Sequence, residues 1–216
     1  MTRKNVNKGA TPNSKINISQ EETSMRTLFL KESSRGYDAL HSEDLLLKER
    51  IVFFTEEVTP ESSVELIRVL LCLELEDPGK EITICLNSPG GEVISGLSVI
   101  DTIRGLKCPV RTVCLGMAAS MGALIFLSGD KREMLPNAKV LIHQPRIDGN
   151  GGTKTALEYE KTANELMDTR RILSEIIAER TGHTIEEIYE KSKTDYTFNA
   201  EEALEYGVAT NIVKHI

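Results

Sequence analysis

Short apolar runs alternate with longer segments of helical periodicity through the middle of the chain. The apolar runs have the length and β-branched content of buried strands. These strands are predicted at residues 50–54, 81–87, 109–116 and 139–145. Between them, residues 60–77 and 92–106 predict amphipathic helices, and residues 120–129 predict a short buried helix ended by Gly129. This alternation favours an α/β protein of repeated βαβ units around a largely parallel sheet.

The same periodicity predicts which side chains the two longer helices bury. A helix that packs on a sheet presents one apolar stripe to it. The stripe is expected to consist of Val64, Ile67, Leu70, Leu71 and Leu75 in the first helix, and Val93, Leu97, Ile100 and Ile103 in the second. We expect these residues in the core.

A long charged segment in the last third of the chain predicts a helix of a different kind. It runs from about residue 156 to 180, and Gly182 follows it as a C-terminal cap. Its first half is too polar for a core helix, so we expect it to project from the body or to pack against another copy. Two capping boxes then predict the starts of further helices. They are Thr184 with Glu187 and Asn199 with Glu202.

Residues 1–25 are polar and lack any period, so we expect a disordered segment or a leader, followed by one domain over residues 26–216. The net charge of −7 gives no footprint for nucleic acid. No apolar run is long enough to span a bilayer, and no secretory signal is present, which favours the cytoplasm. The cysteines lie in apolar segments without metal-ligand spacing, so we expect four small buried hydrophobic residues and no metal site.

Ser120 is the first candidate for chemistry. It follows a predicted strand and begins an apolar helix, whose free N–H groups and positive dipole end would stabilise an oxyanion. The simpler interpretation is an N-cap serine. A nucleophile elbow is excluded, because the pattern G-x-S-x-G needs a glycine where Ala118 stands.

A second strand end faces the same side of the predicted sheet. In "NSPGGEV", residues 87–93, two glycines allow positive φ angles and aim N–H groups into a cleft. His143, at the end of the fourth strand, is the best-placed general base among the four histidines, although a buried structural histidine is the common alternative. Asp195 is held between a helix and a capped turn, but the residues alone do not distinguish it from the other acids.

Three stretches together resemble ClpP, the proteolytic subunit family of Clp-type ATP-dependent proteases. They are "LNSPGGEVISGLSVIDTI", "GMAASMGALIFLSGDKREMLPNAKVLIHQP" and "YTFNAEEALEYG", and the similarity runs from about residue 37 to 212. The resemblance implies a ClpP/crotonase-like fold with a protruding handle helix at about 147–180. It also implies a serine endopeptidase that degrades unfolded polypeptides and needs no cofactor.

The resemblance assigns roles residue by residue. Ser120 matches the family's nucleophile, His143 its base and Asp195 its orienting acid, while the N–H groups of Gly90 and Met121 match its oxyanion hole. The positions that match substrate-binding residues are Gly91, Pro145, Gly151 and Gly152. The resemblance further implies homo-oligomeric heptameric rings, two of them stacked, that an AAA+ unfoldase ATPase feeds with substrate.

Several positions depart from the family pattern and indicate a divergent paralogue. Thr83 and Cys85 replace two tyrosines of the surface where the ATPase docks, and Lys193 and Thr194 replace an Asp-Arg pair that senses ring pairing. These changes keep a second interpretation open, a weakly active or regulatory ring subunit that assembles with an active paralogue. A crotonase-like acyl-CoA enzyme on the same core is the third.

Overall fold

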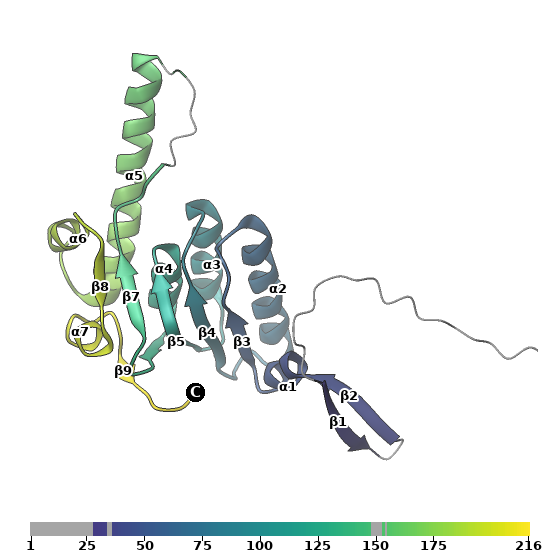
Figure 1. The fold of residues 1–216 in the computed structure, drawn as a ribbon. Coiled ribbons are helices and arrows are strands. Elements are labelled where there is room, and N and C mark those ends of the chain that lie inside the picture. The colour runs from purple at the N-terminus through teal and green to yellow at the C-terminus, as the bar shows by residue number, and fades with distance from the viewer. Residues whose placement is uncertain (1–27, 34–35, 148–152, 154) are drawn as a thin grey trace, which may run out of the picture. The chain divides into compact units, whose positions relative to one another are not determined.

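The computed structural model describes residues 28–33, 36–147, 153 and 155–216 (Figure 1). The chain divides into two compact units at Ser42. In the first, β1 (Leu28–Ser33) pairs antiparallel with β2 (Gly36–His41). The apolar pattern did not predict this hairpin, and the segment 1–25, expected to be disordered, lies outside the described residues.

The second unit is built on a mostly parallel sheet, as the pattern predicted (Figure 1). Its strands are β3 (Ile51–Phe54), β4 (Ile82–Ser88), β5 (Val110–Ala119), β6 (Lys131–Met134) and β9 (Asn211–Ile212), parallel and adjacent in that order. β7 (Lys139–Ile142) runs parallel to the last residues of β5, and β8 (Tyr196–Phe198) runs antiparallel to β7. β5 therefore pairs with β6 near its start and with β7 at its end, where Ser120 follows.

Seven helices accompany the strands over the described residues. They are α1 (Ser42–Lys48), α2 (Pro60–Glu76), α3 (Val93–Gly105), α4 (Met121–Ser128), α5 (Ala156–Thr181), α6 (Ile185–Lys191) and α7 (Ala200–Glu205). The predicted positions of α2 to α5 agree with these bounds to within about two residues. The capping boxes at the starts of α6 and α7 are confirmed, since each side-chain oxygen accepts the expected backbone hydrogen bond.

The buried face of α2 differs from the predicted one. Leu66, Leu70 and Leu73 are buried, whereas Leu71 and Leu75 are 43% and 84% exposed. Val64, also expected in the core, is exposed as well. The helix is apolar around more than one face, so periodicity alone did not select the side that meets the sheet. That choice was made by the packing of α2 against α3 and the sheet.

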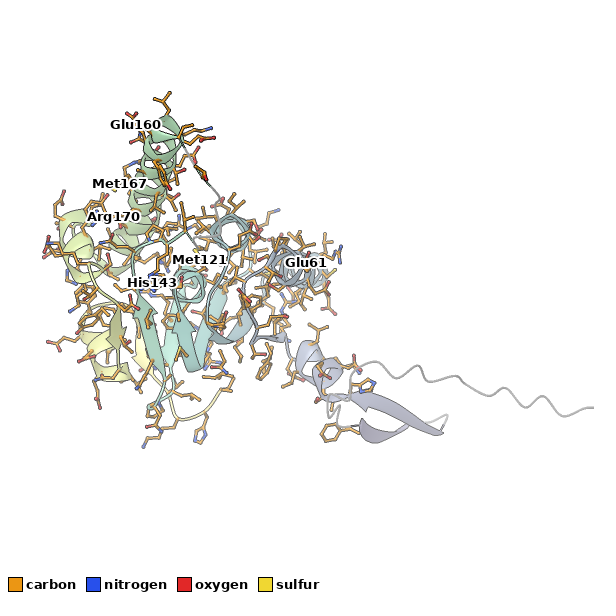
Figure 2. All side chains as sticks on the ribbon, turned by 45° about the horizontal axis from the view of Figure 1, so that its top comes forward. Glu61, Met121, His143, Glu160, Met167 and Arg170 are labelled. Atoms are coloured by element: carbon orange, nitrogen blue, oxygen red, sulfur yellow. The ribbon has the colours of Figure 1, made fainter. Side chains whose placement is uncertain are left out.

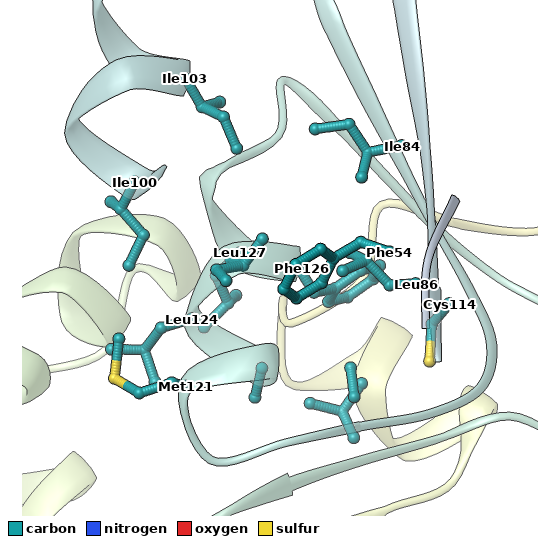
Figure 3. Packing of buried hydrophobic residues seen from close by; sticks show 14 of the residues in the cluster. Phe54, Ile84, Leu86, Ile100, Ile103, Cys114, Met121, Leu124, Phe126 and Leu127 are labelled. Carbon is teal, nitrogen blue, oxygen red and sulfur yellow. The ribbon is translucent and has the colours of Figure 1, made fainter. Parts of the chain in front are cut away.

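The core forms around α4, in which every residue is buried (Figure 3). Its side chains meet those of α3 and of the sheet; Phe126, for example, belongs to one cluster with Ile84, Leu86 and Ile100. Full burial of each large aliphatic or aromatic side chain contributes about 1.5–3 kcal/mol. The helix that begins beside Ser120 is therefore anchored along its whole length.

α5 divides into an exposed first half and a packed second half. Leu173, Ser174, Ile176 and Ile177 are buried, whereas the residues before them are mostly exposed. Figure 1 shows its first half extending beyond the end of the sheet. Gly182 ends the helix with φ 79°, and its N–H donates to the carbonyl of Ala178. The projecting polar helix is thus confirmed.

The cysteine prediction holds for three of the four thiols. Cys85, Cys108 and Cys114 are buried, but Cys72 is exposed on the outer face of α2. All four are free thiols. The misplacement of Cys72 has the same cause as that of Leu71, the orientation of α2. No helix within the described residues has both the length and the apolar character needed to cross a bilayer.

Candidate active site

Ser120 joins the end of β5 to the start of α4 in an unusual backbone conformation. Its φ of 54° and ψ of −122° are those of the first central position of a type II′ turn, which glycine normally occupies. The N–H of Ser120 donates to the carbonyl of Leu141 at 2.9 Å, and its carbonyl accepts from the N–H of Ala123 at 3.0 Å. The side chain makes no capping hydrogen bond. Ser120 thus occupies the N-cap position of α4, as the simpler interpretation expected, but its hydroxyl is not used for helix capping.

The Pro-Gly-Gly turn packs directly against the Ser120 turn, as the sheet topology predicted. Gly90 has φ 89°, and a Cβ on it would lie only 2.5 Å from the carbonyl oxygen of Ala119 and 2.7 Å from Cβ of Ser120. Gly91 has φ 150°, and the backbone of Val58 fills the space where its Cβ would lie. Only glycines allow the two strand ends to approach this closely.

A pocket of about 240 Å³ opens at this contact, and five of the predicted site residues line it. They are Ser120, His143, Met121, Gly91 and Pro145. Apolar side chains complete one part of its wall, namely Val93, Leu124, Ile142, Leu173 and Ile177. The polar remainder of the lining includes Arg146, Arg170, Ser174 and Ser192. Gly151 and Gly152, expected to bind substrate, lie outside the described residues.

The N–H groups beside Ser120 differ in their availability. Met121 begins α4, so its N–H has no acceptor within the helix and lies at the positive end of the helix dipole. The N–H of Gly90, however, donates to Ser88 Oγ at 3.2 Å, and Gly90 does not line the pocket. The N–H of Gly91 has no hydrogen-bond partner among the described residues. The structure thus does not support Gly90 as an oxyanion donor, and Gly91 is the better-placed glycine.

His143 follows β7 directly, and one of its ring nitrogens contacts the backbone of the next residue. Nδ1 lies 2.5 Å from the carbonyl oxygen of Gln144. A carbonyl oxygen can only accept, so Nδ1 carries the proton and Nε2 is left as the basic nitrogen. No hydrogen bond joins His143 to Ser120 in the part of the chain that the structure describes, although both line the pocket.

Asp195 lies across from His143 through strand pairing. Ile142 of β7 is paired with Tyr196 of β8, which places the next residue of one strand opposite the preceding residue of the other. Yet the carboxylate accepts a hydrogen bond from the guanidinium of Arg146, and both side chains are more than half exposed. This hydrogen bond lowers the pKa of Asp195, to which the nearby His143 adds a smaller effect. The three predicted catalytic residues are near one another but not hydrogen-bonded as a triad.

Arg146 and Arg170 were missed by the sequence analysis. Arg146 follows Pro145 directly, so its position next to a predicted strand end was a signal that could have identified it as a site residue. Arg170 lies on α5, 50 positions from Ser120 in the chain, and only the packing of α5 against α4 brings it to the pocket. Among the described residues, no group of three or more His, Cys, Asp or Glu side chains could hold a metal ion.

Comparison with known proteins identifies the family to which this chain belongs. The profile of the Clp protease family matches residues 32–216. The ATP-dependent Clp protease proteolytic subunit 2 of Chlamydia trachomatis serovar D is 41% identical over 186 residues, which is 85% of this chain and 90% of that protein. The protein of the same name from Chlamydia trachomatis serovar A matches with the same identity and coverage. Since the match covers most of both chains, this chain belongs to the Clp protease family, a family of serine peptidases.

Proposed function

We propose that this chain is the serine endopeptidase subunit of a Clp protease that cleaves unfolded polypeptides, with Ser120 as nucleophile and His143 as base. The observation that carries the proposal is the position of Ser120. Its strained backbone holds a hydroxyl that caps nothing at the mouth of a pocket shared with His143. Backbone strain of this kind clusters at active sites.

The reaction begins when Nε2 of His143 takes the proton of Ser120 Oγ and the oxygen attacks a peptide carbonyl. The resulting oxyanion is bound by the N–H groups of Met121 and Gly91. Each such donor lowers the barrier by about 3 kcal/mol. His143 then gives its proton to the leaving amine, and water hydrolyses the acyl-enzyme in a second passage through the same steps.

Asp195 acts in this reaction after it changes partner. At rest its carboxylate pairs with Arg146, and Nδ1 of His143 donates to the carbonyl of Gln144. Rotation of the partly buried His143 ring and of the exposed Asp195 carboxylate would allow Nδ1 to donate to Asp195, which would stabilise the imidazolium that forms during attack. Because the Arg146 pair is exposed, giving up this pair costs about 1 kcal/mol or less.

The assembly follows from the family and from the exposed half of α5. We infer heptameric rings, two of them stacked through this projecting helix, in the cytoplasm. The Chlamydia relatives are named as proteolytic subunits of an ATP-dependent protease. By analogy, an AAA+ unfoldase ATPase would deliver substrate to the active sites.

The resting pair of Asp195 with Arg146 also favours a second candidate, a weakly active ring subunit that requires an active paralogue. Peptide hydrolysis by the purified chain, alone and mixed with such a paralogue, separates the two functions. A chain that is inert alone but stimulates the paralogue would favour the second.

The test of the endopeptidase proposal is Ser120→Ala. We expect the variant to lose both peptide hydrolysis and labelling by a fluorophosphonate, while gel filtration shows an unchanged assembly. Ser98→Ala is the matched control, because Ser98 lies exposed on α3 and donates only to the carbonyl of Ser95. Hydrolysis that survives in Ser120→Ala would overturn the proposal.

A further inference from the structure

The pocket beside Ser120 is positively charged although the chain is acidic. Among the described residues that line it are two arginines and no carboxylate, whereas the whole chain carries a net charge of −7. Arg146 is already paired with Asp195. Arg170 takes part in no ion pair within the described part of the chain. The positive charge of Arg170 is thus available to a bound molecule.

The environment of Arg170 leaves one donor unused. Its guanidinium carbon lies 4.0 Å from the centroid of the Tyr189 ring, so the aromatic ring covers one face of the group. Its Nε is buried and has no hydrogen-bond partner. Figure 2 shows Arg170 on α5 and, on the neighbouring elements, Met121 and His143. Arg170 is only partly buried as a whole, so the remainder of its guanidinium can be approached from the pocket. A positive charge that is partly removed from water and has no counter-ion is unfavourable, and an anionic group bound in the pocket would stabilise it.

The rest of the wall selects the shape of that acceptor. Leu124, Leu173 and Ile177 provide apolar contacts that suit methylene groups. Ser174 and Ser192 are buried and polar at the same pocket. A short aliphatic chain that ends in a carboxylate could pack against the apolar side chains and bind to the polar groups of this wall. Among amino-acid side chains, glutamate matches this description best.

We propose that Arg170 is a specificity-determining residue that makes this pocket bind an acidic side chain, glutamate above all, at the residue whose carbonyl Ser120 attacks. The inference rests on the proposed endopeptidase function and adds a substrate preference to it. The alternative is that the pocket binds an apolar side chain and that Arg170 does not contact the substrate.

The test compares three fluorogenic peptides that differ only in the residue before the scissile bond, which is Glu, Gln or Leu. We expect the wild-type chain to cleave the Glu peptide with at least about tenfold higher kcat/KM than the Gln peptide, because a hydrogen bond to a charged group is worth about that factor. Arg170→Gln abolishes this ratio, because the neutral side chain no longer favours the charged peptide. Arg170→Lys retains part of the preference, since the charge remains.

Arg171→Gln is the matched control. Arg171 is the next residue of α5, pairs with Glu175 and does not line the pocket, so the ratio should stay at the wild-type value. Binding measured in the Ser120→Ala background gives a readout that does not depend on turnover. There, an uncleaved Glu peptide should bind more tightly than its Gln counterpart, and the added Arg170→Gln change should remove the difference.

The possible outcomes distinguish a failure of this substrate preference from a failure of the proposed endopeptidase function. If fluorophosphonate labels Ser120 but the Glu and Gln peptides are cleaved and bound equally, the inference is wrong and the endopeptidase remains. An unchanged Glu preference in Arg170→Gln would equally refute the role of Arg170. If Ser120 is neither labelled nor needed for cleavage, the endopeptidase proposal itself fails.

Discussion

Replacing Ser120 by glycine should stabilise the folded protein while it removes the nucleophile. The conformation at φ 54° and ψ −122° costs a residue with a Cβ about 1–3 kcal/mol, and no capping hydrogen bond of the side chain offsets this cost. Glycine removes the strain but loses about 0.5–1 kcal/mol through its more flexible unfolded state. The expected net gain is about 0.5–2 kcal/mol. Ser120→Ala keeps the Cβ and the strain, so its stability should stay near that of the wild type.

Arg50 provides the contrasting case. It also has a positive φ, of 62°, but it is buried and its guanidinium donates to the backbone carbonyls of Leu73, Asp77 and Lys80. Arg50→Gly relieves the same kind of strain yet leaves these carbonyls without their donor. We expect a net loss of about 3 kcal/mol or more, since hydrogen bonds to a charged group contribute about 1.5–3 kcal/mol.

The assay is urea unfolding followed by far-UV circular dichroism, because the chain contains no tryptophan. All variants are compared at one protein concentration, since assembly contributes to apparent stability. A midpoint for Ser120→Gly at or below that of Ser120→Ala would refute the argument. It would mean that the backbone at position 120 is not under strain.

Three further predictions follow from the same region and from the core. Gly90→Ala should abolish fluorophosphonate labelling and cost about 2–5 kcal/mol of stability, because its Cβ meets backbone atoms at a positive φ; Gly105→Ala, whose Cβ meets nothing within 4 Å, should not. Burial raises the pKa of the Cys114 thiol to about 12. The unfolded chain therefore releases this proton from about pH 9 upward while the folded chain keeps it, so stability falls as pH rises, more steeply in urea titrations of the wild type than of Cys114→Ala. Arg146→Ala should free Asp195 and speed peptide hydrolysis by up to about fivefold, as an exposed ion pair is worth about 1 kcal/mol or less; unchanged or slower hydrolysis would show that the pair does not compete with His143.

Much of the fold was predictable because its elements carry local signals. The apolar runs of β3 to β5 and β7, the glycine that ends α5 and the capping boxes of α6 and α7 all act within one or two turns of chain. The strand β6 escaped prediction because three of its four residues are charged, and β8 and β9 escaped because they have only three and two residues. Segments this short are held by the neighbouring strand more than by their own composition.

The site was predictable only in part. The Ser120 turn and the Pro-Gly-Gly turn stand at strand ends, and in a parallel sheet such ends meet at one edge, so the sequence predicted that these two turns lie together. His143 was predicted only as the best general base among the four histidines. The roles of Ser120 and His143, together with that of Asp195, came from the family resemblance and stay a proposal. The sequence indicated neither the strain at Ser120 nor the hydrogen bond that occupies Gly90. Both depend on how closely two turns from different βαβ units approach each other.

By itself, then, the amino-acid pattern determined which segments become strands and helices and which strand ends carry polar groups, since these follow from local periodicity and capping. Tertiary structure decided the buried face of α2, the pairing of Asp195 with Arg146 and the arrival of Arg170 in the pocket. The physical reason is that contacts between residues far apart in the chain depend on relative orientations of whole elements. Those orientations are chosen by the combined packing of the core and not by any single segment.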